Sequence, residues 1–187
     1  IVNNIYFDDE AYSSYKSNIY GDSSRVKLRY RWYGNVRDSI KGVFEIKFKR
    51  NLYGWKKKIN IDGLDIIKIN NWKIICNSIL NKLPKKEREF FKFNSKPKII
   101  NQYHRDYFLS KNNKFRITVD KNHCIYDQRF YSYPNYLKKT LSQRIIVMEF
   151  KFSRKDRLEI DRLMDSIPIR SSRNSKYVNS IRAVTGI

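Results

Sequence analysis

Polar and apolar residues alternate strictly near the start of the chain. Arg25, Lys27, Arg29 and Arg31 take turns with Val26, Leu28, Tyr30 and Trp32. Residues two apart on a β-strand share a face. The pattern therefore predicts a strand with one cationic face and one apolar face.

Similar alternation predicts the other strands, and helical spacing of apolar residues predicts the helices. The other predicted strands are residues 3–9, 43–50, 55–61, 102–110, 114–120 and 144–152. The predicted helices are residues 11–19, 65–83, 155–167 and 175–184, and residues 85–98 are expected to be irregular and solvent-exposed. With no repeats or linkers, residues 1–187 are expected to form one α+β domain with a mostly antiparallel sheet.

The net charge of the chain limits the classes of binding partner to be expected. It has 40 Lys and Arg against 18 Asp and Glu, a formal net charge of +22. Such a balance predicts an anionic partner, which is nucleic acid, an acidic membrane surface or a phosphate compound. Lys, Asn and Ile are abundant throughout, so scattered lysines carry little information, and arginines at fixed spacing carry more.

The cationic faces have two interpretations. They are either the wet side of a half-exposed sheet or the lining of an enclosed phosphate site. Like charges two residues apart lie ~7 Å from each other, which costs about 0.6 kcal/mol in water and about 2.4 kcal/mol at an effective dielectric near 20. An exposed row is tolerable, whereas an enclosed row requires a bound polyanion. The alternation alone leaves both interpretations open.

Other features exclude several classes of protein. Cys76 and Cys124 have no framework spacing, which suits a reducing compartment. No apolar run approaches the ~20 residues of a membrane helix, and no signal peptide is expected. The six glycines form neither a P-loop nor a dinucleotide-binding motif. Because the chain opens on Ile1 without Met, we expect the natural N-terminus to lie upstream.

Six motifs in sequence order resemble those of a known family. They are RYRWYG (29–34), FEIKFK (44–49), YHRDYF (103–108), FRITVD (115–120), MEFKF (148–152) and NSKYV (174–178). Together with IYFDD at residues 5–9, they resemble the VTC domain, the polyphosphate polymerase branch of the triphosphate tunnel metalloenzymes in the CYTH-like superfamily. No single motif is specific, but the ordered set covers nearly the whole chain.

The resemblance implies an antiparallel β-barrel with flanking helices and a tunnel lined by Arg and Lys. It implies a cytoplasmic transferase that binds ATP and Mg²⁺ or Mn²⁺ and adds the terminal phosphate of ATP to inorganic polyphosphate. Association with the inner face of a membrane and a membrane-protein partner stay open, and no specific nucleic acid is expected. The family's first strand is expected before Ile5 and is missing here, which leaves the activity of this chain open.

The resemblance also assigns site residues. Arg29, Arg31 and Lys47 are the expected catalytic cations, and Glu149 is the expected metal ligand. The expected phosphate ligands are Arg29, Arg31, Lys47, Lys58, Tyr103, Arg105, Arg116, Lys151, Ser175 and Lys176. Lys58 is the weaker match, because Asn60 stands where the family usually has Arg.

Several alternatives are weighed against these roles. A zinc site from His104, His123 and the cysteines fits no common spacing. Cys76 is expected to be buried in a helix and not to act as a nucleophile, and Asp120 is expected to mark the end of its strand and not to be a second metal ligand. The three lysines at 56–58 form either a solvated turn or, for Lys58, part of the tunnel. A polyphosphate-binding module without turnover, a tripolyphosphatase and a nucleic-acid binder remain alternatives to the polymerase.

Overall fold

The computed structural model describes residues 1–137, 139–141, 145–168 and 170–186. Eight strands in this part of the chain form one antiparallel sheet, with neighbours in the order β4-β3-β2-β1-β5-β6-β7 and β8 paired to β6. The strands are β1 (Val2–Asp8), β2 (Ser24–Tyr33), β3 (Lys41–Arg50), β4 (Tyr53–Asp62), β5 (Lys96–Leu109), β6 (Phe115–Asp127), β7 (Lys139–Leu141) and β8 (Val147–Phe152). The α+β class with an antiparallel sheet is confirmed.

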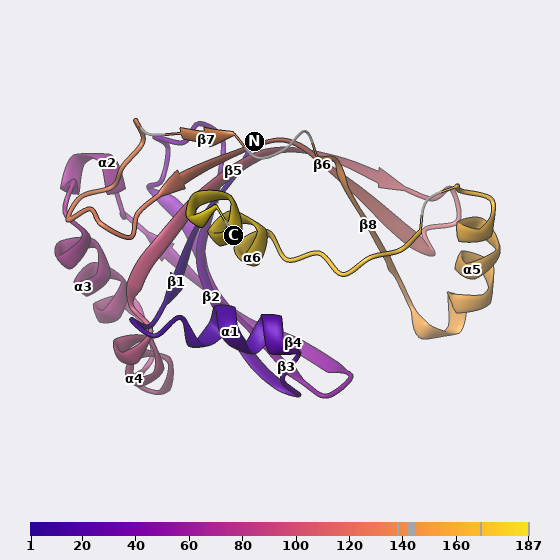
Figure 1. Ribbon diagram of the computed structural model, residues 1–187, viewed down its shortest axis with the longest axis horizontal. Helices are drawn as coiled ribbons and strands as arrows, with labels where there is room; N and C mark the ends of the chain where they lie inside the picture. The colour runs from indigo at the N-terminus through magenta and orange to yellow at the C-terminus, as the bar shows by residue number, and fades with distance from the viewer. Residues whose placement is uncertain (138, 142–144, 169, 187) are drawn as a thin grey trace.

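The sheet curls into a half-barrel (Figure 1). The helices around it are α1 (Ser13–Tyr20), α2 (Ile66–Ile69), α3 (Trp72–Lys82), α4 (Lys85–Phe93), α5 (Arg157–Asp165) and α6 (Lys176–Thr185), with a 3₁₀ turn η1 (Arg154–Asp156) before α5. Helices α2, α3 and α4 gather at one end, and α6 lies beneath the arch of β5 and β6 (Figure 1). Among the described strands, β4 pairs only with β3 and β8 only with β6, so the half-barrel is open between them.

The main hydrophobic core lies on the convex side of the sheet. Leu28, Tyr30 and Trp32, the predicted apolar face of β2, are at most 1% exposed and belong to this core. Phe44 and Phe91 join it from β3 and α4, with ring centroids 5.0 Å apart. Because the apolar faces pack outward against the helices, the cationic faces line the concave side.

A second, smaller core fixes α6 inside the concavity. Tyr177 and Ile181 of α6 pack with Tyr6, Ile99 and Ile125 of the sheet, and all are buried. The Tyr177 hydroxyl donates to the Asp8 carboxylate at 2.7 Å. Helix α6 therefore fills one end of the half-barrel and leaves the other end to the cations.

The prediction of one helix over residues 65–83 was wrong. The chain forms α2 and α3 instead, with Asn70 between them at φ 44°. Asn71 then caps α3 by accepting a hydrogen bond from the Ile74 amide at 3.2 Å. Asparagine tolerates this left-handed conformation and is a preferred helix cap, so two adjacent Asn residues end one helix and begin the next.

The prediction that residues 85–98 are irregular and exposed was also wrong. Residues Lys85–Phe93 form α4, and β5 begins at Lys96. Phe91 is fully buried, and the Glu87 carboxylate accepts a hydrogen bond from Lys57 of β4 at 2.5 Å. The exposed charged residues of α4 are Lys85, Lys86, Glu89 and Lys92, while Glu87 and Phe91 are buried on its inner face.

Candidate phosphate-binding cleft

Three lysines from neighbouring strands lie side by side on the concave face. Lys27 of β2 is opposite Lys47 of β3, and Lys47 is opposite Lys56 of β4. Directly opposite residues on antiparallel strands have Cβ atoms ~4.5–5.5 Å apart, and like charges at such positions are destabilising. The row therefore concentrates positive charge that the sheet alone does not neutralise.

Burial and the close spacing of positive charges lower the pKa of two lysines in this row. Burial of the ammonium group, together with the charge of Arg29, lowers the pKa of Lys47 to about 7. Burial and the neighbouring Arg25 and Arg29 lower the pKa of Lys27 to about 8. Both lysines therefore lose their proton near neutral pH. Part of the Lys47 side chain still contacts the solvent of the concavity.

These lysines line a cleft of about 480 Å³. The charged residues that line it are Arg25, Lys27, Lys47, Lys49, Lys56, Lys151 and Glu149. Asn18 of α1 and Trp55 of β4 also contribute to the wall. A cleft with six cations and one carboxylate is suited to a polyanion.

A second group of cations, next to the cleft, is paired with carboxylates. Arg29 donates to the Glu45 carboxylate through Nε, at 2.6 Å, and through Nη2. The Arg31 guanidinium lies 4.0 Å from Glu45, donates to Asn4 Oδ1 at 2.9 Å and to the Tyr103 hydroxyl at 3.3 Å. Burial alone would raise the pKa of Glu45, but Arg29 and Arg31 outweigh it and lower the pKa. Both guanidinium groups are held in fixed orientations.

Asp120 joins three elements on the same face. Its carboxylate accepts two hydrogen bonds from Arg105 of β5, at 2.5 and 2.7 Å, and lies 2.5 Å from the Lys176 ammonium of α6. The Tyr103 ring lies between these cations, with Arg105 5.3 Å and Lys176 5.0 Å from its centroid. The prediction that Asp120 ends its strand was wrong, because β6 continues to Asp127. Asp120 is fully buried because two cations satisfy it.

Ser175 connects α6 to the lysine row. It is the N-cap of α6, and its hydroxyl accepts a hydrogen bond from the Val178 amide at 3.4 Å. The same oxygen accepts from Lys27 Nζ at 2.8 Å. The start of α6 therefore faces the cleft.

Strand β8 supplies the wall opposite the lysine row. Glu149 and Lys151 lie 3.3 Å apart, and their side chains are 45% and 44% exposed. Arg116 lies directly opposite Lys151 on β6 and is exposed. Lys58 is opposite Glu45 on β4 and is also exposed.

A comparison with protein families decides the identity of this fold. The model of the VTC domain matches residues 1–185, essentially the whole chain. The chain belongs to the VTC domain family. This family is related to polyphosphate polymerases and is associated with phosphotransferase activity. No curated protein matches the chain.

The concave face of this VTC domain brings most of the expected site residues together. Arg29, Arg31, Arg105 and Lys176 form the paired group, which Glu45 and Asp120 hold together and which Tyr103 contacts. Lys47, Lys151 and Glu149 lie at the cleft, which Ser175 approaches through Lys27. Lys58 and Arg116 share this face at its exposed positions.

In the described part of this VTC domain, the expected metal ligand Glu149 does not belong to a larger group of metal-binding side chains. Among the described residues, no group of three or more His, Cys, Asp or Glu side chains is placed to hold an ion. Glu149 lines the cleft with one oxygen near Lys151. Mg²⁺ is commonly held by one or two carboxylates together with substrate phosphates and water. Glu149 therefore fits a divalent ion that arrives with phosphate and does not form an all-protein cage.

Sequence reasoning missed several residues of the site. Glu45 and Asp120 were not recognised as the partners of the arginines. Arg25, Lys27, Lys49 and Lys56 were not assigned to the candidate phosphate site, although alternation already placed Arg25 and Lys27 on the face of Arg29.

In the described part of this VTC domain, no helix is long and apolar enough to cross a membrane.

Proposed function

We propose that this VTC domain is a metal-dependent polyphosphate polymerase, which transfers the terminal phosphate of ATP to inorganic polyphosphate. The observation that supports it most is the row of Lys27, Lys47 and Lys56 on three adjacent strands. For charges ~5 Å apart, each like pair costs between about 0.8 kcal/mol in water and about 3 kcal/mol at an effective dielectric of 20. A chain of phosphates would replace this repulsion with attraction.

The two groups of cations are suited to different parts of the substrate. Arginine binds phosphate oxygens through a planar fork, and Glu45 already orients the guanidinium of Arg29. Arg29 and Arg31 are therefore suited to the reacting phosphates, whose geometry matters. The lysines are point charges on flexible stems and suit the rest of a polyphosphate chain, which has to slide.

The proposed reaction needs no protein nucleophile. A terminal oxygen of the polyphosphate attacks the γ-phosphorus of ATP, the bond from that phosphorus to the β-phosphate oxygen breaks, and ADP leaves. Such a reaction depends mainly on positioning and on neutralising charge. Arg29, Arg31 and Lys47 would hold the phosphates in line. A Mg²⁺ or Mn²⁺ ion at Glu149 would neutralise charge on the phosphate oxygens.

The test is the formation of phosphate polymer by purified protein incubated with ATP and Mn²⁺. Glu149→Gln is expected to abolish turnover and to leave polyphosphate binding within about twofold. Glu159→Gln is the matched control, because Glu159 of α5 is also 45% exposed and pairs with Lys114, away from the cleft. Polymer formation by Glu149→Gln at the wild-type rate would contradict the role of Glu149.

A polyphosphate-binding module without turnover is the second candidate. It is favoured by Glu149 being the one acidic side chain among the described residues that line the cleft. Tight binding of polyphosphate with neither polymer nor released phosphate would identify this function. Released phosphate without polymer would identify a triphosphatase.

A further inference from the structure

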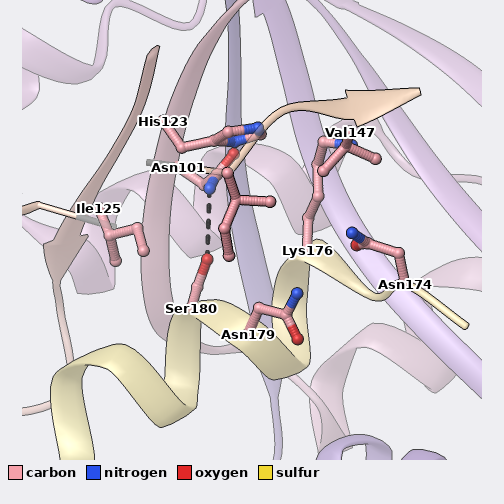
Figure 2. A pocket seen from close by; sticks show the side chains of 9 residues that line it. Asn101, His123, Ile125, Val147, Asn174, Lys176, Asn179 and Ser180 are labelled. Atoms are coloured by element: carbon pink, nitrogen blue, oxygen red, sulfur yellow. Dashed lines mark hydrogen bonds between the residues drawn. The ribbon is translucent and has the colours of Figure 1, made fainter. Parts of the chain in front are cut away.

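A small, partly open cavity lies where α6 meets the sheet. Its volume is about 30 Å³. Asn101 of β5, His123 of β6, Val147 of β8, and Lys176 and Ser180 of α6 are among the residues that line it (Figure 2). The cavity is thus bounded by the helix on one side and by strands of the sheet on the other.

Two polar atoms at this cavity lack a partner in the protein. Asn101 is 2% exposed, and its Nδ2 donates to Ser180 Oγ at 3.2 Å, but its Oδ1 accepts no hydrogen bond. His123 Nε2 is buried and unpaired as well. Rotating the Asn101 amide by half a turn would only exchange its oxygen and nitrogen. A buried polar atom without a partner costs about 1–3 kcal/mol, so the protein gains if something fills the cavity.

We infer that the cavity binds one water molecule, which bridges Asn101 Oδ1 and His123 Nε2 and thereby ties α6 to the sheet. A water requires about 10–15 Å³ of space for a probe of its own size, and two to four polar partners. The Ser180 hydroxyl, whose oxygen accepts the Asn101 bond, can donate its proton as a third partner. The Lys176 ammonium, which also lines the cavity, disfavours a metal cation.

The water site positions the cations of the paired group. The His123 ring packs against Tyr103 with centroids 5.2 Å apart, and Tyr103 contacts Arg31, Arg105 and Lys176. The same water holds the first turns of α6, from which Lys176 reaches Asp120. The inference does not depend on the proposed polymerase activity, since the site stands apart from the cleft.

Nuclear magnetic resonance of the whole ligand-free chain tests the water directly. We expect nuclear Overhauser effects from a long-lived water to the Asn101 side-chain amide protons. Gln128 is the matched control within the same protein. It is fully buried, and its amide donates to Tyr126 and Asn135 carbonyls at 3.0 and 2.8 Å and accepts from the Asn135 amide at 2.7 Å. It should show no such effect.

A variant tests the consequence for α6. His123→Phe keeps an aromatic ring on Tyr103 and removes Nε2. We expect it to lose the water signal at Asn101 and to speed hydrogen exchange of the α6 amides roughly tenfold, as the loss of one hydrogen-bonding partner predicts. Exchange around Gln128 should stay unchanged. Absence of the water signal in the wild-type protein would overturn the inference, whether or not the variant folds, and so would unchanged exchange in a folded variant.

Discussion

At the scale of single residues, the proposed function predicts that Lys47 couples phosphate binding to proton uptake. Its pKa is lowered to about 7, so about half of the ligand-free molecules lack this charge at neutral pH. A bound polyanion would favour the charged form and raise the pKa. We therefore expect tripolyphosphate to bind roughly tenfold more weakly at pH 8 than at pH 6, with net uptake of protons near pH 7.

Isothermal titration in buffers of different ionisation enthalpy measures this uptake. Lys47→Arg keeps the charge and removes the titration, so it should abolish most of the proton uptake and flatten the pH dependence. Lys85→Arg, at the exposed start of α4, is the control and should behave as the wild type. Equal proton uptake by Lys47→Arg would show that another group is responsible.

Glu45 is the carboxylate that balances Arg29 and Arg31. Glu45→Gln leaves Arg29 and Arg31 buried without their counter-charge, so the free energy of unfolding should fall by about 3–5 kcal/mol. Tripolyphosphate should restore more stability to this variant than it adds to the wild type, because an added anion can replace the lost carboxylate. Urea unfolding with and without tripolyphosphate measures both effects.

Glu89→Gln is the control for this prediction, because Glu89 pairs with Lys92 on the surface of α4. It should change neither the stability nor the response to tripolyphosphate. If Glu45→Gln gained no more from the ligand than Glu89→Gln does, Glu45 would have only a structural role.

At the scale of elements, α4 packs against the convex face of the sheet through Phe91. Phe91 is fully buried, with its centroid 5.1 Å from Phe7 and 5.0 Å from Phe44. Phe91→Ala should lower the free energy of unfolding by about 3–5 kcal/mol, through lost burial and the cavity left behind. Phe93, at the end of the same helix, is 78% exposed, and Phe93→Ala should stay within about 0.5 kcal/mol of the wild type. Comparable losses in the two variants, measured by urea unfolding, would contradict this packing.

The strands could be predicted and α4 could not, for a physical reason. Alternation on β2 separates cations from apolar residues completely, and the structure buries one set in the core and turns the other toward the concavity. In α4, KKEREFFKF, charged residues outnumber apolar ones and hide the spacing that places Phe91 inward. The carboxylate partners in the site were missed because Glu45 and Asp120 meet their cations across strands, and alternation gives the face of a residue but not its neighbour.

At the scale of the whole molecule, the net charge of +22 attracts any polyanion, even without a specific site. The fold distinguishes this nonspecific attraction from binding in the cleft. The lysines of the cleft line one concave surface, whereas Lys85 and Lys86 project from the exposed start of α4. The cations of the cleft are therefore placed to contact one bound chain together.

The salt dependence of binding separates these populations. When a polyanion binds, each contacted charge steepens the fall of affinity with salt, as in protein–nucleic acid complexes. Replacing both Lys47 and Lys56 with Gln should reduce the slope of log affinity for tripolyphosphate against log salt by about 1–2, while replacing both Lys85 and Lys86 with Gln, the same change in net charge, should leave it unaltered. Fluorescence titration between low and moderate salt gives both slopes. If the two double variants lost slope equally, binding would follow the total charge of the molecule. A loss confined to the Lys47 and Lys56 variant would require that the curled sheet, by bringing those side chains onto one ligand, creates the site.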